Sequence, residues 1–182
     1  HCATTSASAY TVKFDNVAVS PSNYTYGTPA NDKKAYTLTL GATTTPPTLG
    51  TVVTNLAEWQ RVADSIVITW QLRWSSSGTS GTGTYLLPLP SGLTVDTSKI
   101  SDVNTGAGAF TVVGNGSATF SGIGTYTLQA VYYNTTNFAI VLSSGNLWGS
   151  TTGGLGAASG ALSITATLPI TGWSSSVQMS DN

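Results

Sequence analysis

Carboxylates are the side chains of this sequence that could carry acid–base chemistry. There are seven, and they are Asp15, Asp32, Glu58, Asp64, Asp96, Asp102 and Asp181. A glycoside hydrolase needs two of them facing each other across a sugar, with the pKa of one raised. No spacing in the sequence pairs any two, and most lie in turn-like contexts where Asp accepts hydrogen bonds from backbone amides. The sequence therefore predicts turn residues rather than an active site.

Nucleophilic and metal chemistry lack their usual partners. A serine nucleophile needs a histidine base, and the single histidine, His1, stands at the first position. One histidine and one cysteine, Cys2, cannot supply a zinc site or an internal disulfide. Asp96, Asp102 and Asn104 do not match the spacing of an EF-hand, and its final Glu is missing. We therefore predict a non-enzymatic protein with no metal and no cofactor.

Aromatic and amide side chains are the remaining candidates for ligand contacts. Sugar-binding sites stack an aromatic ring on a pyranose and use amides to bind its hydroxyls. Two turn-like segments carry both kinds of side chain: Tyr133 with Asn134 and Asn137, and Asn146 with Trp148. We predict that these five residues bind a sugar weakly, with avidity between copies supplying useful affinity. Plain turns are the alternative interpretation.

Composition limits the classes of partner. Only 7% of the 182 residues are charged and the formal net charge is -1, whereas an average domain has roughly 25% charged residues. A nucleic-acid binder needs a basic face, and no apolar run approaches the roughly 18 residues of a membrane helix. We therefore expect no nucleic-acid partner and no membrane insertion. A charge-poor β-rich surface also favours an oligomer that buries its edges.

The segment from Ile66 to Trp74 identifies the fold class. Its apolar side chains, including Trp70 and Trp74, occupy every second position, and Gln71 and Arg73 point the other way. This period of two predicts a β-strand with one apolar face, so Trp70 and Trp74 should lie in the core or in a subunit interface.

Similar short strands recur along the chain, with helix expected only as one turn over 96–99. They include 36–40, 51–54, 56–64, 109–113 and 118–120, and the Ser/Gly/Thr-rich segments 75–83 and 150–160 read as surface loops. We predict an all-β protein with an antiparallel two-sheet jelly-roll sandwich.

Three motifs follow one another in a characteristic order. They are Trp59-x-Arg61-Val62-x-Asp64, then Leu89-Pro90-Ser-Gly92-Leu-Thr-Val-Asp96-Thr-x-Lys99, then Leu168-Pro169-Ile-Thr-Gly172-Trp173. Together they resemble the C-terminal module of bacteriophage tail-fibre and related virion proteins, from about Tyr36 to Trp173. Ala63 stands where that family usually has glycine, and alanine tolerates positive φ poorly. Segment 10–19 resembles the last strand of the carbohydrate-binding-type jelly rolls that often precede this module.

The resemblance implies a homotrimeric fibre tip of a virion. Residues 36–174 would form the jelly-roll head, 1–20 the terminal strand of an upstream module, 21–35 a linker and 175–182 a tail. The tip would bind a host-surface receptor, a glycan or a protein, and would join other virion proteins through its N-terminal side. The alternatives are a purely structural trimerisation or decoration module of a virion, and a secreted bacterial carbohydrate-binding module, which would be extracellular.

The motif residues Trp59, Arg61, Asp64 and Trp173 are interpreted as structural or interface residues. Arg61 and Asp64 are three residues apart, so on an extended strand they point to opposite faces and should not pair with each other. We expect Arg61 to meet a carboxylate on a neighbouring strand or subunit.

Overall fold

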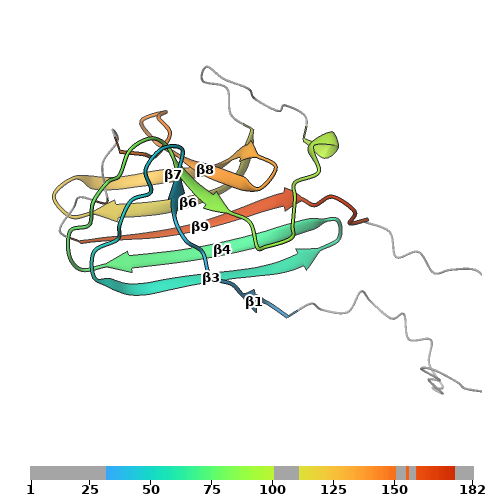
Figure 1. Ribbon diagram of the computed structural model, residues 1–182, viewed down its shortest axis with the longest axis horizontal. Coiled ribbons are helices and arrows are strands. Elements are labelled where there is room, and N and C mark those ends of the chain that lie inside the picture. Colours follow the sequence, from blue (N-terminus) through green and yellow to red (C-terminus); the bar gives the residue numbers. More distant parts are fainter. Residues whose placement is uncertain (1–31, 101–110, 151–154, 156–158, 175–182) are drawn as a thin grey trace, which may run out of the picture.

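The structure is a computed structural model that describes residues 32–100, 111–150, 155 and 159–174. The strands are β1 Lys34–Ala35, β2 Gly41–Ala42, β3 Val52–Val62, β4 Ser65–Trp74, β5 Tyr85–Pro88, β6 Val112–Phe120, β7 Gly124–Asn134, β8 Asn137–Leu142 and β9 Gly160–Pro169. They form one sheet in the order β1-β3-β4-β9-β6-β7-β8-β5-β2, and every neighbouring pair is antiparallel (Figure 1).

This architecture confirms the predicted all-β antiparallel class. The described residues contain no α-helix, and the single predicted helical turn is present as the 3-10 helix η1, Thr97–Lys99. Segments 51–54 and 56–64, predicted as separate strands, are parts of the single strand β3, which has a bulge between Val52 and Thr54 and ends at Val62 before the turn at 63–64. Residues 112–113 of the predicted strand 109–113 and residues 118–120 likewise belong to the single strand β6, and residues 109–110 lie outside the described residues. Two strands were predicted because Gly114 and Gly116 lack the side chains that would show a period of two.

Strand β4 is the centre of one half of the sheet. It pairs along its whole length with β3 on one side and with β9 on the other. Its alternating apolar side chains, including Trp70 and Trp74, are at most 1% exposed, while Gln71 and Arg73 lie on the exposed face. The prediction that Trp70 and Trp74 are buried is confirmed, and both lie in the core of the chain itself.

The β3–β4 connection is a two-residue turn, because Val62 pairs with Ser65. Ala63, its first residue, takes a φ of 55°, the single positive φ among the described non-glycine residues. Positive φ at this position is why hairpin turns of this length favour glycine. The chain therefore makes the turn without the usual glycine, at a cost of roughly 1 kcal/mol for an alanine in this region.

Segment 34–42 joins the two edges of the sheet. At one end β1 pairs with β3 and Tyr36 N donates to Ala57 O (3.0 Å), while at the other end β2 pairs with β5. Between these ends Leu38 and Leu40 are buried in the core. The predicted strand 36–40 is therefore a crossing segment, and the sheet curls until one short piece of chain spans both edges (Figure 1).

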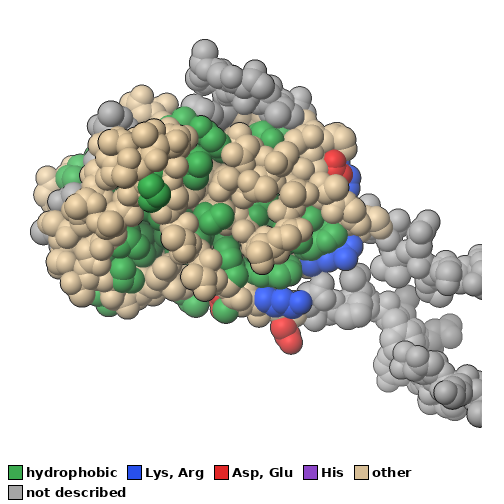
Figure 2. Space-filling model, in the orientation of Figure 1, with side chains coloured by type: hydrophobic (Ala, Val, Ile, Leu, Met, Phe, Trp, Pro, Cys, Tyr) green, Lys and Arg blue, Asp and Glu red, His purple; other side chains and the backbone are tan. Residues whose placement is uncertain are grey.

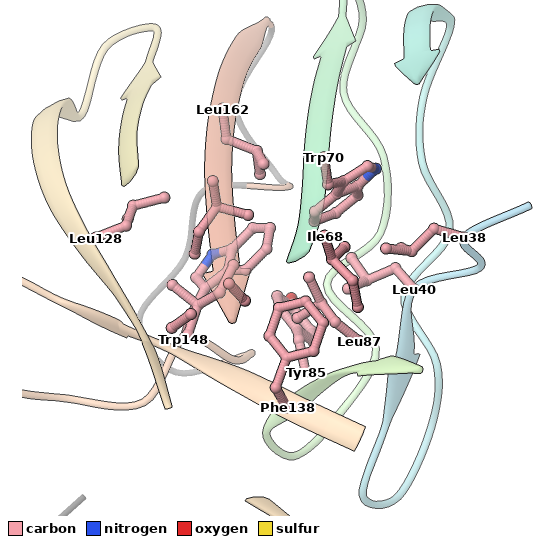
Figure 3. Close-up of a cluster of buried hydrophobic side chains, with 14 of the residues drawn as sticks. Leu38, Leu40, Ile68, Trp70, Tyr85, Leu87, Leu128, Phe138, Trp148 and Leu162 are labelled. Carbon is pink, nitrogen blue, oxygen red and sulfur yellow. The ribbon is translucent and has the colours of Figure 1, made fainter. Parts of the chain in front are cut away.

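The core fills the inside of this curl. Figure 3 shows side chains from β4, β5, β8 and β9 meeting those of Leu38 and Leu40, and they belong to one continuous cluster of buried residues. Trp148 is part of it: its ring stands edge-on to Tyr85 at 4.9 Å and stacks on Phe120 at 6.1 Å. Burial of these large rings contributes substantially to the stability of the fold.

Glycines allow unusually close backbone approach between β6 and β9. A Cβ atom on Gly114 would collide with the carbonyl oxygen of Thr165, and one on Gly116 with that of Ser163. Both clashes are with backbone, which cannot rotate away. The two glycines of the Gly114-Asn115-Gly116 sequence are therefore required where β6 lies against β9.

The segment 75–83, predicted as a surface loop, is paired with residues 43–51. Thr45 N donates to Thr82 O at 3.1 Å, and Thr48 N donates to Thr79 O at 3.1 Å. Gly78 and Gly81 leave no room for a Cβ against this neighbour. Glycine-rich composition here reflects close packing of two backbones rather than a free loop.

Candidate functional site

The three sequence motifs converge at one corner of the molecule. Val95 forms a bridge with Ile170, and Asp96 N donates to Pro169 O at 2.9 Å. Ile170 N in turn donates to Asp64 O, also at 2.9 Å. The loop after β5, the end of β9 and the β3–β4 turn are thereby joined through backbone hydrogen bonds, and we call this arrangement the motif corner.

The motif glycines have a backbone role in this corner. Gly92 and Gly172 have φ values of 83° and 79°. Leu93 N donates to Pro90 O at 3.2 Å and Trp173 N donates to Ile170 O at 3.1 Å. Each glycine is the third residue of its turn, where a type II turn requires positive φ.

Lys99 connects all three motifs through its side chain. Its Nζ lies 3.0 Å from Asp64 Oδ2 and 3.6 Å from Asp96 Oδ2, and it donates to Trp173 O at 3.3 Å. The hydrogen bond from Lys99, followed by that from Ser65, holds the pKa of Asp64 below its ordinary value. Hydrogen bonding from Ser98 lowers the pKa of Asp96, and the hydrogen bond with Asp64 raises the pKa of Lys99. A glycosidase acid needs a raised carboxyl pKa, so the pKa shifts of Asp64 and Asp96 run in the wrong direction for that role.

Aromatic and cationic side chains form a half-exposed stack beside the corner. The Trp59 and Trp173 rings stack with centroids 6.3 Å apart, and Lys34 Nζ lies 5.3 Å from the Trp59 ring. The Arg61 guanidinium lies 4.8 Å from the Trp173 ring, and its Nε and Nη2 donate to Ala63 O and Ser174 O. Figure 2 shows the few charged side chains of this view gathered towards β1, η1 and the β3–β4 turn.

These contacts bear on two expectations about the first motif. Arg61 and Asp64 have different partners, as predicted, since Asp64 pairs with Lys99. Arg61 meets no carboxylate within the described part of the chain, where its guanidinium lies over Trp173 instead. A carboxylate on a neighbouring subunit stays a prediction. The face of an indole attracts a guanidinium without the cost of fully dehydrating an ion pair.

Replacing Lys99 with Met should destabilise the protein in a pH-dependent manner. The folded pKa values of Asp64 and Asp96 are lowered, so the stabilisation that they contribute is full above their ordinary pKa of 3.8 and is lost as the pH falls through the folded values. Urea unfolding of wild type and Lys99→Met, followed by tryptophan fluorescence from pH 7 to pH 2, should show a difference that shrinks below about pH 4.

Lys33→Met is the matched control for this series, because the Lys33–Glu58 pair is exposed and 3.7 Å long. Exposed pairs of this kind contribute little to stability. A Lys99→Met effect that stayed constant over the whole pH range would contradict the assigned role of Lys99.

The predicted sugar-binding residues do not form one site. Asn134 Oδ1 accepts from Thr136 N at 3.0 Å and from Asn137 N at 2.8 Å, and Asn137 Nδ2 donates to the same oxygen at 3.0 Å. These amides close the β7–β8 turn. Asn146 lies at the other end of β8, where its carbonyl accepts from Leu142 N. At the rise of a strand, the two ends of β8 are about 16 Å apart.

Trp148 cannot stack on a sugar, and that prediction is wrong. Its side chain is 1% exposed, whereas that of Tyr133 is 36% exposed. The backbone explains the inward direction, because Trp148 N donates to Ile140 O and Tyr85 N donates to Trp148 O. Trp148 thus continues the sheet between β8 and β5 and points its ring into the core.

An open groove with mixed polar and apolar lining crosses the outward face of β3, β4, β9 and β6. It consists of two adjoining hollows of about 440 and 410 Å³ that share Arg73, Thr119 and Ala161. Hydroxyl and amide side chains of Thr54, Gln71, Ser117 and Ser163 belong to its lining. We call it the Arg73 groove. The alternation from Ile66 to Trp74 correctly predicted that Gln71 and Arg73 lie on the outer face. It did not indicate which strands lie beside them.

Comparisons with family models, with curated proteins and with solved structures find no match to this chain. No group of three or more His, Cys, Asp or Glu side chains that could hold a metal ion occurs within the described ranges. Across those same ranges, no helix has the length and apolar character needed to cross a membrane.

Proposed function

We propose that this chain is a non-enzymatic, homotrimeric fibre-tip protein of a virion, with a jelly-roll head that binds a glycan or protein receptor on the host surface. The observation that carries the proposal is the convergence of the three motifs. The three motifs that resemble the tail-fibre module are separate stretches of the sequence, but they lie together in the structure. Lys99 links them through its contacts with Asp64 and Trp173. The proposal places the protein on a tail fibre or another virion appendage, with other virion proteins as neighbours on its N-terminal side.

Three further features support this function. The curled sheet encloses one core, which suits the two-layer packing of a jelly roll. The carboxyls of Asp64 and Asp96 are kept ionised, which suits a structural rather than a catalytic role. The Arg73 groove offers hydroxyl, amide and guanidinium groups on an exposed face, which suits recognition of a hydroxyl-rich receptor.

Two alternatives each have an observation in their favour. The motif corner is built entirely of internal contacts among the described residues, which suits a purely structural trimerisation or decoration module. A groove on a sheet face also suits a secreted bacterial carbohydrate-binding module, which would act outside the cell.

Binding to intact bacteria tests the proposed function. The fluorescently labelled chain should bind saturably to some strains of a diverse panel, and analytical ultracentrifugation should give three times the mass of the chain. Periodate oxidation of the cell surface should abolish binding if the receptor is a glycan, and protease treatment should do so if it is a protein. A trimer that binds no strain would favour the structural module, and a monomer that binds isolated polysaccharide would favour the bacterial module.

A further inference from the structure

We propose that the Arg73 groove binds an acidic oligosaccharide, with the guanidinium of Arg73 holding the carboxylate of a uronic or sialic acid unit. This inference rests on the proposed function, which it deepens by naming the ligand class and the site. The site differs from the β7–β8 and β8 turns that the sequence had favoured.

Strand register arranges the groove in two parallel rows of side chains. In one row Gln71 of β4, Ser163 of β9 and Ser117 of β6 are neighbours. In the other, Arg73 lies beside Ala161, which lies beside Thr119. The short side chains of β9 therefore make a low floor, and the longer Gln71 and Arg73 stand along one side of it.

Arg73 supplies an unopposed positive charge to this groove. Its residue is exposed, and no other described residue forms a hydrogen bond or ion pair with its side chain. Among the described residues, no carboxylate lines either hollow. Glu58 stands next to Thr69, four residues along β4 from Arg73, and pairs with Lys33. A planar guanidinium with free donors fits a carboxylate through two parallel hydrogen bonds.

The rest of the lining selects a saccharide among anionic ligands. Serine, threonine and glutamine side chains donate to and accept from sugar hydroxyls, and they surround Arg73 in the first hollow. A nucleic acid or a highly sulfated glycan needs several cations along its length, and Arg73 is the single cation among the described residues that line the groove. One cation among several hydroxyl-binding groups matches a saccharide that places one carboxylate in the groove and its hydroxyls along the rest of the lining.

The test measures binding of the full chain to a panel of oligosaccharides by microarray and isothermal titration calorimetry. The probes are tetramers of galacturonate, glucuronate, mannuronate and sialic acid, the methyl ester of each, and a heparin fragment. At least one acidic tetramer should bind, and its methyl ester should bind roughly tenfold more weakly, because it loses one charge-assisted interaction. Arg73→Gln should weaken the acidic tetramer by the same factor and leave its methyl ester unchanged.

Three further variants separate the groove from general effects of charge and folding. Lys33→Gln removes one positive charge from a side chain outside the groove lining, and it should bind as wild type does. Ser163→Tyr should block the groove, while Thr167→Tyr, on the same exposed face of β9 but outside the lining, should not. Thermal unfolding of each variant checks that it is folded.

The groove assignment and the proposed function can fail separately in these experiments. Binding to none of the acidic tetramers, equal binding of acid and ester, or wild-type binding by Arg73→Gln would each overturn the groove assignment. Preference for heparin over every carboxylate tetramer would overturn the ligand class. In all these cases binding of wild-type chain to intact bacteria would still report separately on receptor binding. Loss of cell binding in Arg73→Gln, with Lys33→Gln unaffected, would support both the groove assignment and the proposed receptor-binding function.

Discussion

Replacing Trp148 with Ala should lower the free energy of unfolding by about 3–5 kcal/mol, the usual cost of truncating a buried tryptophan. The ring is 1% exposed and contacts Tyr85 edge-on and Phe120 in a stacked arrangement. Its removal leaves a cavity between two halves of the curled sheet, where β5, β6 and the residues after β8 meet. Urea unfolding followed by circular dichroism at 25 °C measures the loss.

Tyr133→Ala is the matched control for this prediction. Tyr133 belongs to the other aromatic turn of the sequence, but its side chain is 36% exposed. A surface truncation of this kind should change stability by about 0.5 kcal/mol or less. Equal stability of Trp148→Ala and Tyr133→Ala would mean that Trp148 is not part of the core.

Gly114→Ala should destabilise the protein by about 1–3 kcal/mol, the range for inserting an atom where there is no space. The new Cβ would collide with the carbonyl oxygen of Thr165 and the backbone of Ala166, so β6 and β9 would have to separate. Urea unfolding and the loss of slow amide exchange along β9 would report this separation.

Gly41→Ala provides the comparison. A Cβ at Gly41 would lie 3.5 Å from Leu86 O, an ordinary contact, and no positive φ is required there. We expect this variant to match wild type within about 0.5 kcal/mol, as harmless substitutions do. If Gly114→Ala were equally silent, the close approach of β6 to β9 would not be a feature of the folded protein.

Side-chain periodicity determined how much of the fold could be predicted. Strand β4 was predicted correctly because each of its positions shows which face it occupies. Strand β6 was predicted as two pieces because Gly114 and Gly116 carry no side chain and so show no period. Segment 36–40 alternates as a strand does, yet it crosses between two edges, which depends on strands far away in the chain.

Long-range contacts explain why the candidate sites were harder to predict. The local sequence of Asn146 and Trp148 indicated a turn but not the direction of the indole, which is set by hydrogen bonds with Ile140 and Tyr85. The Arg73 groove depends on β9 lying between β4 and β6. Nothing near Arg73 in the sequence indicates that Ser163 and Ser117 line the same groove.

The crossing segment 34–42 has a consequence for self-association. Its two ends cover part of the β3 edge and part of the β5 edge, so one short segment protects both edges of the sheet. If this segment detached, it would expose unpaired backbone at two separate places in one event. A molecule with two open edges can accept one neighbour on each side and so grow into a chain, whereas one open edge stops at a pair. The chain has few charges to oppose association. The attachment of Leu38 and Leu40 to the core therefore controls whether these two edges are open to neighbouring molecules.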